Sequence, residues 1–171
     1  MPETRKGAIN WKGNPMDLIG PGLKAGDQAP TDWTVVGNDM SAVSAKDLAG
    51  QKRIVLTVPS LDTAVCDTET RRFNQEATSV PGVKIWVISA DLPFAQKRWC
   101  GAAGVSNVVT LSDYKDRAFG PAWGTFAPAK GLHARAVFVI GADDVIRHVE
   151  YVADATTEPD YAAALQAAKA L

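Results

Sequence analysis

Three short apolar runs, separated by more polar segments, dominate the pattern of this chain. They are Ile54–Val58, Val83–Ala90 and Arg135–Ile140, the last of which opens on an arginine. Apolar runs without alternation are typical of strands that are covered on both faces, as in parallel sheets. The pattern therefore predicts a central sheet with cover on both sides.

Helical periodicity follows the first of these strands. From Val65 to Thr78 the sequence has a helical pattern, and Cys66, Phe73 and Ala77 recur on one face of the expected helix. Since Phe73 and Ala77 are suited to a core, Cys66 is expected to look inward, at the floor of a pocket. Pro59 and the residues up to Thr63 form the turn between strand and helix.

A second helix is predicted at Asp91–Ala103, because Asp91 is a suitable N-cap and Pro93 is suited to a first helical turn. The other expected elements are a hairpin at Gly7–Leu18, a strand at Asp32–Gly37, a helical turn at Ser44–Leu48, a strand at Val108–Leu111, a short helix at Asp116–Trp123, a late hairpin that ends in Val145–Val152, and a last helix at Tyr161–Leu171.

The alternation of strands and helices indicates an α/β fold. We expect a mixed central sheet flanked by helices, in which the central strands are parallel and the late hairpin adds an antiparallel edge. A chain of 171 residues is expected to form one domain, residues 1–171, with a sizeable core.

Charge and composition narrow the function classes. With 18 basic and 19 acidic residues, the chain has no excess of positive charge that would attract nucleic acid or an anionic membrane. No segment approaches the roughly 20 apolar residues of a membrane span, and the polar N-terminus does not resemble a secretory signal. We therefore expect a cytoplasmic protein. No metal-ligand spacing and no nucleotide-binding glycine motif is present, so no cofactor is expected.

The two cysteines, Cys66 and Cys100, are the residues with the most distinctive chemistry. Cys66 is expected in the first turn of its helix, where unpaired N–H groups and the helix dipole favour a thiolate. An unperturbed thiol is only a few per cent ionised at pH 7, so full ionisation gains roughly 30-fold, or about 2 kcal/mol of barrier. Efficient catalysis needs further groups. The spacing alone equally fits a buried, inert cysteine.

The residues Pro59, Thr63 and Cys66 form the pattern P-x-x-x-T-x-x-C. This pattern resembles the active-site motif of the peroxiredoxins, which are thiol peroxidases with a thioredoxin-like fold. The segments PSLDTAVCDTETRRFN, SADLPFAQKRWCGAAG, KGLHARAVFVI and TTEPDYAAAL resemble the bacterial thiol peroxidase subfamily, whose members are atypical two-cysteine peroxiredoxins. The resemblance runs from about Gly7 to the C-terminus and implies a thioredoxin-like sandwich with an N-terminal β-hairpin.

The resemblance implies a role for each matched residue. Cys66 would be the peroxidatic cysteine, which attacks hydrogen peroxide or an alkyl hydroperoxide. Thr63 would hydrogen-bond the peroxide, and Pro59 would shield the sulfenic acid from water. Arg135 would stabilise the thiolate and polarise the peroxide. Without the resemblance, Arg135 is more simply a strand-end arginine that reaches solvent.

Cys100 would be the resolving cysteine of the subfamily, forming an intramolecular disulfide with Cys66 that thioredoxin reduces. The resemblance also implies a homodimer. Since a disulfide needs Cα atoms about 4.4–6.8 Å apart, we expect the first turn at Cys66 and part of the Cys100 helix to unwind before the bond closes. Gly101 and Gly104 make the second helix easier to release.

Two alternative functions remain at this point. The same cysteine pair would serve a peroxide-sensing redox switch or binding module. An oxidoreductase acting on protein disulfides would need C-x-x-C, which is absent after Cys66. Val58 stands where many peroxiredoxins have an aromatic residue, so the wall of the pocket differs. Asp67 is expected to point to solvent, because a carboxylate turned inward would oppose the thiolate.

Overall fold

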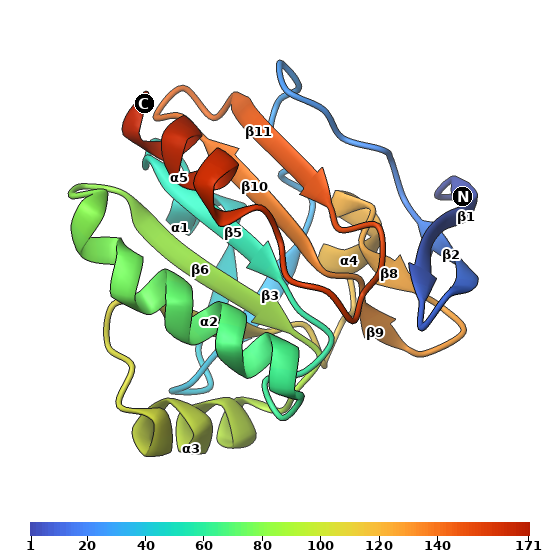
Figure 1. Ribbon diagram of the computed structural model, residues 1–171, viewed down its shortest axis with the longest axis horizontal. Coiled ribbons are helices and arrows are strands. Elements are labelled where there is room, and N and C mark those ends of the chain that lie inside the picture. The colour runs from blue at the N-terminus through green and yellow to red at the C-terminus, as the bar shows by residue number, and fades with distance from the viewer.

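The computed structural model describes residues 1–171 and contains a seven-stranded mixed sheet (Figure 1). β5 pairs in parallel with β6, and β6 with β7, while the other pairs are antiparallel. The expected parallel centre with an antiparallel late hairpin is therefore confirmed. In spatial order the strands are β11 (Ile146–Tyr151), β10 (Ala136–Ile140), β5 (Arg53–Thr57), β6 (Lys84–Ser89), β7 (Val109–Ser112), β3 (Thr34–Gly37) and β4 (Ala42–Ser44).

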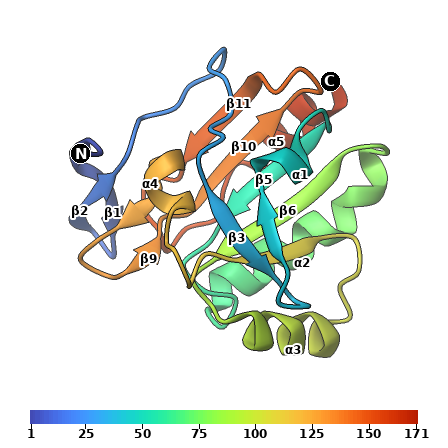
Figure 2. The same ribbon diagram turned by 180° about the vertical axis from the view of Figure 1, so that it is seen from behind.

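Helices cover both faces of this sheet. Figure 1 shows α2 and α5 in front of it, and Figure 2 shows α1 and α4 on the opposite face. α3 lies beside α2 and contacts β7, where Gln96 Nε2 donates to the carbonyl of Leu111 at 2.9 Å. None of the helices has the length and apolar character of a membrane span. Their bounds are α1 (Ala45–Leu48), α2 (Ala64–Glu76) with the 3₁₀ turn η1 (Ala77–Ser79), α3 (Pro93–Ala103), α4 (Phe119–Trp123) and α5 (Tyr161–Lys169).

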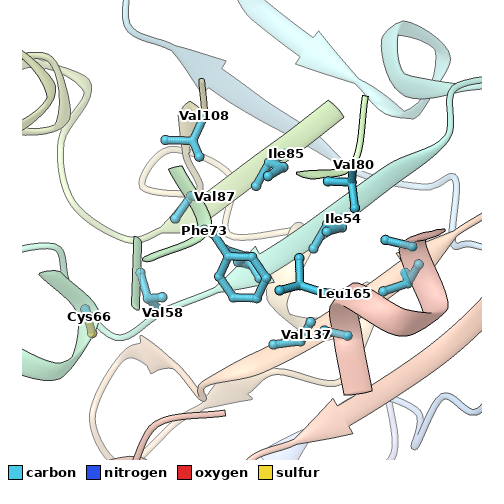
Figure 3. Close-up of a cluster of buried hydrophobic side chains, with 14 of the residues drawn as sticks. Ile54, Val58, Cys66, Phe73, Val80, Ile85, Val87, Val108, Val137 and Leu165 are labelled. Atoms are coloured by element: carbon cyan, nitrogen blue, oxygen red, sulfur yellow. The ribbon is translucent and has the colours of Figure 1, made fainter. Parts of the chain in front are cut away.

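The strand β5 shows why the central runs are continuously apolar. Ile54 and Leu56 face the helices α2 and α5, whereas Val55 faces α1 and α4, so both sides of the strand are buried. Each such side chain contributes about 1.5–3 kcal/mol when it is fully buried. Cys66 lies at one end of the hydrophobic cluster that contains Ile54 and Leu56, closest to Val58 (Figure 3).

The N-terminal hairpin belongs to a second, smaller sheet. β1 (Thr4–Trp11) and β2 (Asn14–Ile19) pair antiparallel, which confirms the expected hairpin and extends its start to Thr4. The turn residues Lys12 and Gly13 both have positive φ, as a tight hairpin turn requires. Two very short strands that the sequence pattern did not predict complete this sheet: β8 (Phe126–Ala127) and β9 (Leu132–His133).

Hydrogen bonds fix the hairpin against the segment after β11. The N–H of Asn10 donates to the carbonyl of Ala153 at 2.7 Å, and the N–H of Ala155 donates back to Asn10 at 2.9 Å. The N–H of Gly13 donates to Oδ2 of Asp154 at 3.0 Å. The tip of the hairpin is thereby held next to residues 153–156.

The prediction that Asp91 is the N-cap of the second helix is wrong. Leu92 occupies that position, with Pro93 in the first turn as expected. The carboxylate of Asp91 instead accepts hydrogen bonds from Ser60 Oγ at 2.7 Å, from Leu61 N–H at 2.8 Å and from Ser89 Oγ at 2.8 Å. These bonds tie the loop after β5 to the end of β6. Asp91 therefore positions the turn that carries the cysteine motif.

The short helix α4 begins at Phe119, later than the expected Asp116. The buried carboxylate of Asp113 accepts hydrogen bonds from the N–H groups of Phe119 and Gly120, at 3.2 and 3.0 Å. The first N–H groups of a helix have no acceptor within the helix. The carboxylate of Asp113, which lies outside α4, binds them and so fixes where the helix begins.

Candidate active site

Cys66 lies in the first turn of α2 and is fully buried. The first N–H of this helix to reach a carbonyl four residues back is that of Asp67, which donates to Thr63 at 3.0 Å. The N–H groups of residues 64–66 therefore lack such partners. They give the helix start a positive potential beside the sulfur.

Arg135, immediately before β10, brings a positive charge to this thiol. Its Nη2 donates to Cys66 Sγ at 3.3 Å, and its Nη1 donates to Glu69 Oε2 at 2.5 Å. Nε and Nη2 also donate to the carbonyl of Ala155, at 3.2 and 2.8 Å. Only 1% of Arg135 is exposed. It is therefore a buried partner of the thiol, which excludes the alternative of a strand-end arginine in solvent.

Glu69 completes the charge cluster and was missed by sequence reasoning. Burial raises the pKa of Glu69 to about 7, against the opposing effect of Arg135. Burial also disfavours the charged guanidinium, but the Glu69 carboxylate and the Cys66 thiolate outweigh it and raise the pKa of Arg135. A signal was present in the sequence, since Glu69 is three residues after Cys66 and shares its inward helix face.

A cavity of about 410 Å³ opens above this cluster. Residues from the motif loop, α2, the hairpin tip and the segment after β11 line it. They are Trp11, Lys12, Pro59, Thr63, Ala64, Val65, Arg135, Ala155 and Thr156. Cys66 is not among them, so its sulfur lies just beneath the floor and Arg135 connects it to the cavity. The motif residues Pro59 and Thr63 are thus brought together with Arg135 and Cys66.

Thr63 has its hydroxyl hydrogen directed at the protein. Its Oγ1 donates to the carbonyl of Ser60 at 2.9 Å. The oxygen lone pairs remain available, so in this geometry Thr63 can accept a hydrogen bond from a molecule in the cavity.

Cys100 is not brought to the cavity. Both cysteines are free thiols, and Cys100 is half-buried on α3. Its Sγ lies 3.5 Å from Oγ1 of Thr110, whose hydroxyl donates to Asn38 Oδ1 at 3.1 Å. The two thiols therefore have separate sets of contacts. No group of three or more His, Cys, Asp or Glu side chains is arranged to hold a metal ion.

Comparison with known proteins assigns this arrangement to a family. The Redoxin family model matches residues 24–165. A thiol peroxidase of Halalkalibacterium halodurans is 52% identical over 95% of this chain and 98% of its own length. That of Bacillus subtilis is 48% identical over 95% and 97%. The chain belongs to the thiol peroxidases of the Redoxin family. It is a peroxidase of the peroxiredoxin type, as the sequence resemblance indicated.

Solved structures agree with this family in their fold. A peroxiredoxin-like protein from Aquifex aeolicus superposes with a TM-score of 0.88 at 39% identity, over 97% of this chain and 96% of that one. A thiol peroxidase from Chromobacterium violaceum superposes with a TM-score of 0.83 at 21% identity, over 91% of each chain. The expected thioredoxin-like α/β sandwich is confirmed.

In this thiol peroxidase a set of polar contacts joins the two cysteine-bearing helices. Asp67 was expected to point to solvent, but both of its carboxylate oxygens accept hydrogen bonds from other side chains. Its Oδ1 accepts from Trp99 Nε1 at 2.9 Å, and its Oδ2 accepts from Arg71 Nε at 2.9 Å. Arg71 also donates to the carbonyl of Ala103 at 3.2 Å, and its guanidinium lies 5.7 Å from the Trp99 ring. We call Asp67, Arg71 and Trp99 the interhelix clamp.

Proposed function

We propose that Cys66 is the peroxidatic cysteine of this peroxidase. The observation that carries the assignment is the buried contact of 3.3 Å between Arg135 Nη2 and Cys66 Sγ at the start of α2. A guanidinium and free N–H groups around one sulfur stabilise a thiolate, which is the nucleophilic form. The spacing alone fitted a reactive and an inert cysteine equally well, and these contacts favour the reactive one.

In the first half-reaction the thiolate of Cys66 attacks the terminal oxygen of a hydroperoxide ROOH. A sulfur–oxygen bond forms and the O–O bond breaks, so the sulfur becomes a sulfenic acid and RO⁻ leaves. RO⁻ takes up a proton and departs as the alcohol, or as water when the substrate is hydrogen peroxide. Arg135 and the N–H groups of residues 64–66 stabilise the developing negative charge. Thr63 accepts the O–H of the peroxide and orients it, and Pro59 keeps water from the new sulfenic acid.

In the second half-reaction Cys100 is the resolving cysteine. Its thiol attacks the sulfenic sulfur of Cys66, a disulfide forms within one chain, and water leaves. Since Cys100 contacts Thr110 in the reduced form, the attack requires α3 and the first turn of α2 to separate from their present contacts. The proposed reductant is thioredoxin, whose dithiol returns both cysteines to thiols as it is itself oxidised.

Two further assignments accompany this cycle. Leu92 and Phe94, beside the motif loop, are 51% and 65% exposed, which supports a homodimer built on this surface. A redox-active pair of thiols, with no other cysteine, is suited to a reducing compartment, and we propose that the enzyme is cytoplasmic.

The test is a peroxide-dependent NADPH assay with thioredoxin and thioredoxin reductase. We expect sustained consumption with hydrogen peroxide and with an organic hydroperoxide, and none with Cys66→Ser. A redox sensor with the same cysteine pair would react once and stop, so a single turnover in wild type would favour that alternative. Cycling by Cys66→Ser would refute the assignment of the peroxidatic residue.

A further inference from the structure

The active-site cavity is much larger than hydrogen peroxide requires. Its volume of about 410 Å³ compares with about 30 Å³ for a water molecule in the liquid. It falls in the range of about 300–1,000 Å³ that is typical of sites for small organic molecules. The space above Arg135 therefore fits the organic part of a hydroperoxide, if the peroxide group is bound as proposed above.

The ionisable side chains that line the cavity are all basic. Lys12 and Arg135 are its only ionisable residues, and no acidic side chain lines the cavity. Arg135 is already committed to Glu69, Cys66 and Ala155. Lys12 is exposed and forms no ion pair. The cavity thus has one free cation, which lies on the hairpin and not in the reacting cluster.

The position of Lys12 is fixed by the backbone. It occupies the left-handed position, φ 51°, of the hairpin turn, and Gly13 beside it is bound to Asp154. The Asp154 carboxylate is an anion beside the hairpin turn and would oppose a negative ligand there. It already accepts bonds from Gly13 N–H, Thr156 N–H and Thr156 Oγ1, which lower its pKa to about 2. It makes no ion pair with Lys12, so the ammonium stays available.

We propose that Lys12 is a specificity-determining residue, which selects organic hydroperoxides that carry a carboxylate. The peroxide group binds at Arg135 above Cys66, the organic part fills the cavity, and the carboxylate meets the ammonium of Lys12 at the hairpin tip. Hydrogen peroxide and neutral hydroperoxides have no group for Lys12. The inference depends on the proposed site at Cys66 and adds a substrate class to it.

The test uses two matched probes, 4-(2-hydroperoxypropan-2-yl)benzoate and the corresponding benzamide, which share one shape and differ in charge. We would measure kcat/KM for each in wild type, Lys12→Met, Lys12→Arg and Lys84→Met. Lys84 opens β6 at the end remote from the motif loop, so Lys84→Met removes one positive charge from outside the cavity. Taking the benzoate-to-benzamide ratio within each variant cancels any general loss of activity.

We expect wild type to prefer the benzoate and Lys12→Met to lower the ratio about two- to fivefold, the size expected for one solvent-exposed ion pair. Lys12→Arg and Lys84→Met should keep the wild-type ratio. The preference should also weaken as ionic strength rises from about 0.01 M to about 1 M, since the Debye length falls about tenfold.

An equal ratio in wild type and Lys12→Met would overturn the proposal, and so would an equal loss in Lys84→Met, which would indicate a diffuse field. These outcomes leave the proposed function intact. That function fails separately, if wild type does not turn over either probe or hydrogen peroxide.

Discussion

The indole Nε1 of Trp99, on α3, donates a hydrogen bond to Oδ1 of Asp67, on α2, at 2.9 Å. Asp67 directly follows Cys66, and Trp99 directly precedes Cys100. The interhelix clamp therefore fastens the two cysteine-bearing helices next to both proposed redox residues. It stabilises the arrangement in which the cysteines are apart, and this arrangement must open before a disulfide forms.

Trp99→Phe should accelerate disulfide formation. The variant keeps an aromatic ring but loses the N–H that donates to Asp67. A hydrogen bond to a charged group contributes about 1.5–3 kcal/mol when buried, and partial exposure reduces this, so we expect roughly a three- to tenfold faster rate. Rapid quenching followed by mass spectrometry would measure the rate of disulfide formation after peroxide addition.

Trp86→Phe is the matched control for this experiment. The indole N–H of Trp86 is buried and has no hydrogen-bond partner, so its removal leaves the clamp intact. A rate in Trp99→Phe equal to or below that of wild type would show that the clamp does not limit resolution.

Arg135→Met should slow the reaction of Cys66 with peroxide. Removing one donor from the charge that develops in a transition state costs about 10²–10³ in rate. The single variant also leaves Glu69 buried without its partner, a loss of about 3–5 kcal/mol in folding stability. The double variant Arg135→Met with Glu69→Gln removes that unpaired charge and keeps the experiment interpretable.

The measurement is the second-order rate constant with hydrogen peroxide, from stopped-flow tryptophan fluorescence. Circular dichroism would establish that the double variant is folded. A folded double variant that reacts at the wild-type rate would remove Arg135 from the proposed mechanism.

Glu69→Gln should change how stability depends on pH. Burial raises the pKa of Glu69 from 4.5 to about 7 in the folded protein. The folded state therefore binds this proton more tightly, and its stabilising contribution is complete below about pH 4.5 and is lost as pH rises through about 7. Relative to Glu69→Gln, wild type should lose free energy of unfolding across this window, on the order of a few kcal/mol.

Urea unfolding of both proteins between about pH 5 and about pH 8 measures this difference. Parallel stability curves for wild type and Glu69→Gln would mean that Glu69 does not titrate there.

Cys100→Ser should stop the cycle after one turnover. Cys66 is expected to react with one equivalent of peroxide and to accumulate as a sulfenic acid, which excess peroxide carries to the sulfinic state. Trapping with dimedone and intact-mass analysis would detect both products. Continued thioredoxin-linked NADPH consumption by this variant would exclude Cys100 as the resolving residue.

The elements with local causes were predictable from the sequence. The apolar runs gave β5, β6 and β10, and the inward face of α2 placed Cys66 beside Phe73 in the core. β8 and β9 have two residues each, too short for any periodicity to indicate them. β8 pairs with β2 of the N-terminal hairpin, which is a long-range contact, and β9 pairs with β8.

The errors in the site have the same origin. Asp91 has the side chain of an N-cap but is occupied by Ser60, Leu61 and Ser89, which the fold brings to it. Asp67 was expected in solvent because a carboxylate turned inward would oppose the thiolate, and nothing in its own helix indicates its partner Trp99. The family resemblance predicted that Pro59, Thr63 and Arg135 lie together near Cys66. The helix face that Glu69 shares with Cys66 indicated that Glu69 is buried, but its pairing with Arg135 depends on the fold.

The carbonyl of Ala155 accepts two bonds from Arg135 and lies on the segment to which the hairpin is anchored. A main-chain oxygen survives every side-chain replacement, so no substitution at position 155 removes this acceptor. The contribution of this oxygen would emerge only from altering the chain itself, by an ester bond or by lengthening the loop. The length of this loop, as well as the identity of its residues, therefore determines how Arg135 is directed at the sulfur of Cys66.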